Sequence, residues 1–424
     1  MKCDILVIGA GVLGLSSAYY LKKRHPKKRV VVIERHGGPG QGSTAKCAGG
    51  FRNMFGSEEN RTLAESTIDC LEHMQSSKGR NIGLSRTGYL YLYSEPQYMK
   101  AKTALEKMNN RGVELRYFDS EDLNRMIPDL ATDISSDEEA ELMGLKSITI
   151  GVQGLKCGTV DADAVARLYE LLFLEAGGEI MYNTSASRLT MGPRVKLGLT
   201  GEPFVWQDAN ITGVLTDKGE IEASTTVLAG GVWSETLLNG IGFESMMRPR
   251  KRIIFTFKDP KIMNLLNLKG FNTLQTLPLT HLTDSKVYLK PDITEGSLWL
   301  GVAEDLGRCF NLEDDPQPEE SMYVRNAYHA LVKYLPCFTN VRPVNSWAGL
   351  RAINTVDKVP VVAPGPGMIY VGSDNGTGIT KCDALGRVTT ALYSGDKEAE
   401  LFNGLKLRIS DVSIEKRCVE KETF

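Results

Sequence analysis

Three glycines and one glutamate near the N-terminus have the types and spacing of a dinucleotide-binding turn. The glycines occur as Gly9-x-Gly11-x-x-Gly14, and Glu34 follows about twenty residues after the last of them. Glycine permits a tight turn at the first position, close approach of a pyrophosphate at the second, and close packing of helix on strand at the third. A carboxylate at this spacing can accept hydrogen bonds from the hydroxyl pair of a ribose. These residues predict a site for the ADP part of a dinucleotide.

The segments around these residues have the patterns that such a site needs. Residues 4–8 form an apolar run that predicts a buried strand, an amphipathic helix follows the glycines, and residues 30–34 predict a second strand ending on the glutamate. The pyrophosphate would then lie against the free N–H groups and the positive dipole end of the helix. Because all these features occur in register, a glycine-rich turn without a ligand is the weaker interpretation.

Two further segments are unusually rich in glycine. Residues 37–52 include Ser43, Thr44, Gly50 and Arg52, and a loop of this composition can press its backbone against a flat ligand. A flexible surface loop is the alternative. Residues 225–234 again run an apolar strand into a turn, at Gly230, and then into a helix. A dinucleotide-binding domain that resumes after an insertion would show this repetition.

Length and charge exclude several classes of protein. The 424 residues exceed one ordinary core and indicate two to three domains, or one domain with large insertions. The net charge is −2, and the one basic cluster, residues 22–29, falls where cations complement the end of the first helix. We therefore expect no nucleic-acid partner.

The cysteines and the hydropathy pattern bear on metals and location. The eight cysteines are scattered without a CxxC pair or a His/Cys cluster, so we expect no metal site and the reduced thiols of a cytoplasmic protein. No apolar run approaches the ~20 residues that span a bilayer, so no transmembrane segment is expected. Peripheral attachment to a membrane is left open.

Three blocks of sequence occur together over about residues 3–395. The first is the N-terminal fingerprint with the loop to Arg52, and the second combines Gly158-Thr-Val-Asp161 with residues 227–234. The third is Trp-Ala-Gly-Leu-Arg, ending at Arg351, followed by the Gly-Thr-Gly of residues 376–378. Together they resemble the FAD-dependent amine oxidoreductases related to D-amino acid oxidase, in particular the branch of glycine oxidase and sarcosine oxidase or dehydrogenase. The third block is the most specific, since many NAD and FAD enzymes share the fingerprint.

The resemblance implies an α/β fold with additional antiparallel β structure. A discontinuous Rossmann-type FAD-binding domain would carry an inserted antiparallel-sheet substrate domain. We assign residues 1–85, 150–245 and 341–395 to the FAD-binding domain and residues 86–149 and 246–340 to the substrate domain. Residues 396–424 form a C-terminal tail that the pattern does not place.

The resemblance also implies roles for residues around a non-covalent FAD. The expected cofactor-binding residues are Gly9, Gly11, Gly14, Glu34, Arg35, Ser43, Thr44, Gly50, Gly230, Gly376, Thr377, Gly378, Ile379 and Thr380. Residues 376–380 would approach the pyrimidine edge of the flavin, where N–H donors at a helix N-terminus stabilise the anionic reduced ring. Leu350 stands where the sarcosine oxidase branch has its flavin-attaching cysteine, and Thr377 stands where many relatives have histidine.

Two arginines are the candidate catalytic residues. A substrate carboxylate suits a planar, two-pronged guanidinium, and Arg351 matches the carboxylate-binding arginine of the family. A salt bridge at the surface or between domains is the alternative. Arg52 could face the substrate or the flavin, or pair with an acid. His281 is the one histidine that could take part in the site, and Tyr288 and Tyr89 could line a substrate cavity, but structural roles are the preferred interpretation for all three.

The resemblance implies an enzyme that oxidises a small amino, imino or N-methyl amino acid, of the glycine, sarcosine or proline type, by hydride transfer to flavin N5. The lone pair of a neutral amine assists the loss of hydride, so no dedicated base is needed. One alternative is an FAD-dependent 2-hydroxy acid dehydrogenase of the L-2-hydroxyglutarate type, which needs a residue to accept the hydroxyl proton. Another is a flavoprotein subunit of a larger electron-transfer complex. A homo-oligomer is also left open.

Overall fold

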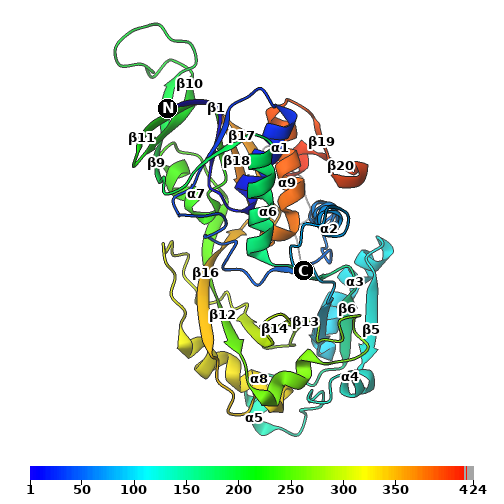
Figure 1. The fold of residues 1–424 in the computed structure, drawn as a ribbon. Coiled ribbons are helices and arrows are strands. Elements are labelled where there is room, and N and C mark those ends of the chain that lie inside the picture. Colours follow the sequence, from blue (N-terminus) through cyan, green and yellow to red (C-terminus); the bar gives the residue numbers. More distant parts are fainter. Residues whose placement is uncertain (415–416, 418–424) are drawn as a thin grey trace.

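The structure is a computed structural model that describes residues 1–414 and residue 417. Within these residues the strands form two sheets of eight strands each and two short two-stranded pairings. Figure 1 shows one sheet and its helices in the upper half of the molecule and the second sheet in the lower half. A mixed α/β half joined to a largely antiparallel half is the fold class that the sequence predicts.

The first sheet brings together apolar strands that are far apart in the chain. Its strands are β1 (Lys2–Ile8), β2 (Val30–Ile33), β8 (Glu179–Met181), β9 (Ala186–Pro193), β10 (Ala209–Thr216), β11 (Gly219–Leu228), β17 (Val361–Gly365) and β18 (Met368–Gly372). The order is β17-β18-β11-β1-β2-β8, and β10 and β9 extend from β11 as antiparallel strands. The pairs that β1 makes with β2 and β11 are parallel, as expected for strands that are buried on both faces.

Helices pack on this sheet and bury its apolar side chains. They are α1 (Val12–Arg24), α2 (Glu58–Lys78), α6 (Ala162–Glu175), α7 (Ser234–Asn239) and α9 (Gly378–Tyr393). One hydrophobic core joins Ile5 of β1 to Leu15 of α1 and Leu385 of α9. The two long helices cross closely at Gly386, where a Cβ would lie 2.8 Å from the backbone of Ser16. This crossing fixes α1 and α9 relative to each other.

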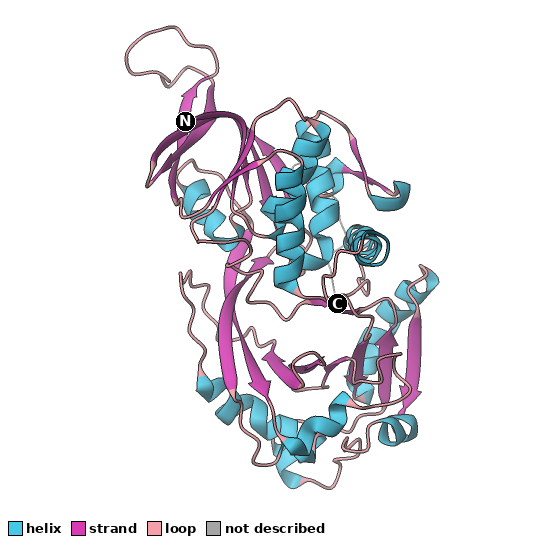
Figure 2. Cartoon of the chain, viewed as in Figure 1, coloured by secondary structure: helices cyan, strands magenta, loops and turns pink. Residues whose placement is uncertain are grey.

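The second sheet is almost entirely antiparallel. Its strands are β4 (Tyr89–Tyr93), β5 (Leu115–Asp119), β6 (Ile150–Gly154), β12 (Met247–Phe257), β13 (Leu279–His281), β14 (Val287–Asp292), β15 (Ser297–Val302) and β16 (Asn345–Asn354). The order is β16-β12-β15-β14-β13-β4-β6-β5, with a parallel pair between β13 and β4. The helices of this half are α3 (Glu95–Asn110), α4 (Ser120–Met126), α5 (Glu138–Leu142) and α8 (Tyr328–Tyr334). Figure 2 shows helices below this sheet, so its other face is turned toward the upper half.

The long pair β12 and β16 connects the two halves. Its strands pair from Met247 opposite Asn354 to Thr256 opposite Asn345. Met247 and Leu350 belong to a core that contains residues of the first sheet, whereas Phe255 belongs to the core of the second. This long antiparallel pair therefore packs against both cores and connects the two sheets.

The sheets differ from the predicted domain boundaries at two strands. The boundaries at residues 150 and 341 put β6 and β16 with the nucleotide half, yet both strands pair in the second sheet. Strand pairing joins segments that are remote in sequence, so the motif blocks did not locate these two boundaries.

The smaller elements lie around the first half and between the halves. β3 (Gly50–Phe51) pairs with β7 (Gly158–Thr159), and β19 (Glu398–Glu400) pairs with β20 (Lys406–Arg408). The tail from residue 396 packs Ala399 and Leu407 into the core around α9. Its residues 415–416 and 418–424 lie outside the described residues. No helix within the described part of the chain is long and apolar enough to cross a membrane.

Candidate cofactor and substrate site

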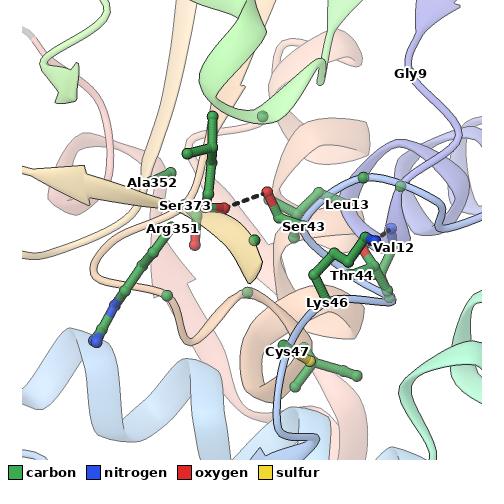
Figure 3. A pocket seen from close by; sticks show the side chains of 18 of the residues that line it. Gly9, Val12, Leu13, Ser43, Thr44, Lys46, Cys47, Arg351, Ala352 and Ser373 are labelled. Carbon is green, nitrogen blue, oxygen red and sulfur yellow. Dashed lines mark hydrogen bonds between the residues drawn. The ribbon is translucent and has the colours of Figure 1, made fainter. Parts of the chain in front are cut away.

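A cavity of about 610 Å³ lies between the two sheets. It is lined by the start of α1, the end of β2, the loop after it, the start of α9 and side chains of the second sheet. Every predicted site residue except Gly14 lines it, including Arg52 and Arg351. Figure 3 shows how the side chains from these elements gather in this region.

The glycines of the N-terminal motif, Gly9, Gly11 and Gly14, have different structural roles. Gly9 has a φ of +104°, and a Cβ there would lie 2.7 Å from the carbonyl oxygen of Ala229. A Cβ at Gly14 would lie 1.9 Å from the carbonyl oxygen of Gly9, so this glycine permits helix packing and does not face the cavity. A Cβ at Gly11 would meet only the Thr44 hydroxyl, at 3.6 Å, and would extend into the cavity. The backbone at Gly11 is therefore open to a ligand.

The start of α1 presents backbone donors to the cavity. The first intrahelical bond runs from Leu15 N–H to the Gly11 carbonyl, so Leu13 and Gly14 N–H have no intrahelical partner. Val12 N–H donates to the Thr44 hydroxyl over 3.3 Å (Figure 3). Together with the helix dipole these amides favour an anionic group such as a pyrophosphate.

Glu34 and Arg35 follow β2 at the edge of the cavity. The Glu34 carboxylate accepts the N–H of Ala10 at 2.8 Å and that of His36 at 3.0 Å. Because a carboxylate has about four acceptor positions, it can still accept ribose hydroxyl groups. The Arg35 guanidinium lies 4.3 Å from the centre of the Trp233 ring and donates to Asp314.

The loop of residues 37–52 is fastened to β16. The Ser43 hydroxyl donates to the Leu350 carbonyl over 2.7 Å (Figure 3), and the Trp347 indole N–H donates to the Lys46 carbonyl over 3.2 Å. A Cβ at Gly349 would lie 2.4 Å from the Cβ of Lys46, so only glycine lets the loop approach the strand this closely. The cavity thus has an ordered wall between its nucleotide and substrate ends.

The turn before α9 is held by a buried ion pair. Lys381 and Asp374 form a salt bridge in which both side chains are almost completely buried. Asp374 also accepts the N–H of Thr377, and Lys381 donates to the Thr377 hydroxyl and to Asn60. Burial alone would raise the pKa of Asp374, but the charge and hydrogen bonds of Lys381 and Thr377 lower it well below its ordinary value. The pair fixes the Thr377 turn at the cavity.

Arg351 lies across this same turn. Gly376 has a φ of +77°, and a Cβ there would lie 2.3 Å from Nε of Arg351. The guanidinium donates to the Asn375 carbonyl through Nε and Nη2. Burial, followed by the charge of Arg252, lowers the pKa of Arg351 to about 10, so it is a cation at neutral pH. A cation thus lies between the cofactor turn and the second sheet.

The second sheet contributes a row of rings to the cavity. His281 lies opposite Tyr91 of β4 and Tyr288 of β14 in the strand register. Its ring stacks on that of Tyr91 with centroids 4.6 Å apart and lies 5.4 Å from that of Tyr288. The Tyr288 ring covers Gly301, whose Cβ would lie 2.1 Å from it. His281, Tyr288 and Tyr89, for which structural roles were the preferred interpretation, all line the cavity.

His281 is a neutral imidazole in this setting. Burial, then the charges of Arg52 and Arg351, lower its pKa to about 3. Among the described residues no hydrogen bond occupies either of its ring nitrogens. Arg52 donates to the Met54 carbonyl and lies 4.4 Å from the centre of the Phe55 ring. The substrate end therefore combines fixed cations with an imidazole that can accept a hydrogen bond.

Sequence reasoning missed two cations that line the cavity, Arg252 and Lys46. Arg252 pairs with Asp305 and donates to the Glu304 carbonyl over 3.0 Å. Arg248, Arg250 and Arg252 alternate along β12, and this alternation was the available signal, because alternate residues face the same side of a sheet. Within the described residues no cluster of His, Cys, Asp and Glu side chains could hold a metal ion.

Comparison with known proteins agrees with this geometry. FAD-dependent oxidoreductase domain-containing protein 1 of Bos taurus is 23% identical over 426 residues, covering 92% of this chain and 81% of that protein. Sarcosine oxidase subunit beta of Rhodobacter capsulatus is 23% identical over 380 residues, covering 89% and 81%. The crystal structure of L-proline dehydrogenase from P. horikoshii shares the fold, with a TM-score of 0.72, 21% identity, and coverage of 93% of this chain and 94% of that one.

The family comparison covers nearly the whole described chain. The sequence matches the family DAO, described as FAD dependent oxidoreductase, over residues 4–392. This match confirms the resemblance that the three sequence blocks indicate, and with it FAD as the cofactor. The chain is an FAD-dependent oxidoreductase and belongs to the DAO family.

Proposed function

We propose that this enzyme oxidises a small amino, imino or N-methyl amino acid of the glycine, sarcosine or proline type. The observation that carries the proposal is the position of Arg351, a half-buried cation that lies against Gly376 and lines the same cavity as His281. When bound, FAD accepts a hydride from the substrate carbon that bears the nitrogen. The chain's own residues would have to bind, orient and desolvate the substrate.

The nucleotide end is proposed to hold the cofactor without a covalent bond. Gly9, Gly11 and the free amides of α1 would bind the pyrophosphate, and Glu34 would bind the ribose. Residues 43–50 and 376–380 would border the flavin ring. Leu350, which lines the cavity, is not a nucleophile, which supports non-covalent binding.

The substrate end is proposed to recognise the carboxylate and the amine separately. Arg351 would bind the carboxylate through its planar guanidinium, and Arg52 would add positive charge nearby. The neutral His281 can accept a hydrogen bond from the substrate N–H. The tyrosine rings beside it would exclude water from the reacting carbon.

The activities named for two similar proteins support this choice and suggest a partner. One relative is a sarcosine oxidase subunit and one structural neighbour is an L-proline dehydrogenase, so both names fall within the proposed substrate class. Because that relative is one subunit of its enzyme, we extend the proposal to a partner subunit that takes up electrons.

A 2-hydroxy acid dehydrogenase remains the second candidate, and one observation favours it. Such an enzyme needs a group to accept the hydroxyl proton, and the sequence offered none. His281 lines the cavity and is a nitrogen base, which favours this candidate. Its pKa of about 3 makes it a weak proton acceptor, which is why this candidate ranks second.

Anaerobic reduction of the bound flavin tests the two candidates directly. The holoenzyme is mixed with glycine, sarcosine, L-proline or L-2-hydroxyglutarate, and the loss of flavin absorbance is followed before air is admitted. Bleaching by an amino acid supports the proposal. Bleaching by the hydroxy acid alone would establish the second candidate instead. Reoxidation by air or only by an added acceptor then distinguishes an oxidase from a dehydrogenase.

A further inference from the structure

An apolar loop projects from the edge of the first sheet. Residues 194–208 join β9 to β10 and extend beyond the sheet at the top of Figure 1. Val205 is 106% exposed and Trp206 is 72% exposed. Val195, Leu197 and Leu199 are each more than half exposed. Five large apolar side chains in one short loop form a patch of the kind that marks a binding surface.

The loop satisfies its polar groups internally. The Glu202 carboxylate accepts the N–H of Leu197 and that of Leu199, each at 2.9 Å. Gln207 accepts the N–H of Phe204 at 2.8 Å and donates to the Val195 carbonyl at 3.3 Å. These bonds give internal partners to several backbone groups of the loop, while five of its apolar side chains are exposed. Backbone groups that enter an apolar phase need such internal partners.

The loop combines two stacked aromatic rings with basic side chains. The Phe204 and Trp206 rings stack with centroids 5.6 Å apart and planes inclined by 18°. Lys196 lies within the loop between Val195 and Leu197, whereas Arg194 lies at its base, where its N–H donates to the Asp208 carbonyl. Neither side chain forms a salt bridge within residues 1–414 and 417. Asp208 is the exposed carboxylate at the base, since that of Glu202 is engaged by the loop amides. Tryptophan and basic residues beside apolar ones are the composition of a membrane–water interface.

We propose that the loop of residues 194–208 docks this enzyme on the surface of an anionic phospholipid bilayer. The apolar tip would enter the headgroup region, and Arg194 and Lys196 would meet anionic headgroups. A single projecting loop is narrow beside the ~800 Å² that each partner of a typical protein interface buries, which favours a lipid surface over a protein. This inference does not depend on the substrate of the enzyme.

Flotation of the holoenzyme with vesicles tests the proposal. We expect binding to vesicles of phosphatidylcholine with phosphatidylserine, weaker binding to phosphatidylcholine alone, and weakening by salt. Trp206→Ser is expected to lower the partition coefficient by roughly tenfold, because it removes one large apolar side chain from the tip. The Trp206 fluorescence should also shift to shorter wavelength on binding, measured as the difference between the wild type and Trp206→Phe.

Leu142→Ser is the matched control, because Leu142 is 89% exposed on α5, outside the loop. This variant should bind vesicles like the wild type. Failure of the wild type to float with either vesicle would overturn the proposal. Equal losses of vesicle binding in Leu142→Ser and Trp206→Ser would also overturn it. A sedimentation mass that falls from dimer to monomer in Trp206→Ser, without vesicle binding, would assign the loop to self-association instead.

Discussion

The two ends of the cavity, which we propose to bind the nucleotide and the substrate, are built in different ways. At the nucleotide end, Gly9, Gly11 and the amides of α1 come from one short stretch of chain. At the substrate end, the row of Tyr91, His281 and Tyr288 comes from three strands that only sheet pairing brings together. The first end works mainly through backbone groups and the second through side chains. Local sequence therefore describes the first far better than the second.

The two ends also differ in their electrostatics. The nucleotide end uses helix N-termini and a turn fixed by the buried pair of Asp374 and Lys381. The substrate end gathers Arg52 and Arg351 around an imidazole whose pKa they help to lower. One end relies on an ion pair to fix a turn, whereas at the other end two arginines surround a neutral ring. Variants at the first end should therefore change stability and FAD content, whereas variants at the second end should change the reaction with substrate.

Gly14→Val should have the most severe consequence, because its Cβ alone would lie 1.9 Å from a backbone oxygen. We expect the free energy of unfolding to fall by about 4 kcal/mol or more, with loss of bound FAD. Urea unfolding and the flavin absorbance of the purified protein measure both effects. Gly240→Ala is the control, since its Cβ comes no closer than 3.4 Å to its neighbours. Normal stability in Gly14→Val would contradict the close packing of α1 on β1.

Lys381→Met should destabilise the fold by about 3–5 kcal/mol at neutral pH, because it leaves the buried Asp374 carboxylate without its cation. In the wild type the low pKa of Asp374 contributes stability above its unfolded pKa of about 3.9, and this is lost only as pH falls toward the folded value. In the variant burial raises that pKa, so acid should stabilise it relative to the wild type.

Urea unfolding at neutral and mildly acidic pH checks this second prediction. Arg80→Met removes one partner of the exposed pair with Glu175 and should cost less than about 1 kcal/mol. If the loss of unfolding free energy in Lys381→Met were the same at both pH values, the broken ion pair would not be its cause.

Arg351→Lys should leave FAD bound but impair the reaction with substrate. A lysine keeps the charge and loses the two-pronged geometry, so kcat/KM should fall by roughly a hundredfold. Stopped-flow reduction at several substrate concentrations would locate the loss in binding. Arg248→Lys, at an arginine that pairs with Glu235 outside the cavity lining, is the matched control. Unchanged substrate binding in Arg351→Lys would remove this residue from the substrate end.

His281→Asn should have a smaller effect, of roughly tenfold on the rate of flavin reduction. With its pKa lowered to about 3, His281 stays neutral above about pH 5, so its titration should not appear in the pH profile there. The variant should therefore shift the whole profile downward without changing its shape. His329→Asn, in α8 and outside the cavity lining, should behave like the wild type. If the rate of flavin reduction changed with pH around 6.5 in the wild type and this change were absent only from His281→Asn, the imidazole would have an ordinary pKa.

The sequence predicted most of the cavity because its nucleotide end rests on short-range patterns. Gly9 and Gly376 show the positive φ angles that only glycine adopts readily, and the motifs around them are contiguous. Arg351 was predicted because it ends the Trp-Ala-Gly-Leu-Arg block, and its neighbours in the fold played no part in that prediction. His281, Tyr288 and Tyr89, for which structural roles were preferred, line the cavity. The sequence could not place them there, because the pattern of a strand does not say which space its inner face borders.

The sequence by itself determined the family, the FAD cofactor and the backbone groups that can bind a dinucleotide. These depend on glycine conformations and helix starts, which a few neighbouring residues dictate. Only the tertiary structure decided that β6 and β16 join the second sheet and that Arg252, Lys46 and His281 face the cavity. Those outcomes depend on strand register between segments far apart in the chain. Shifting one strand by a single residue would turn each of its side chains to the opposite face.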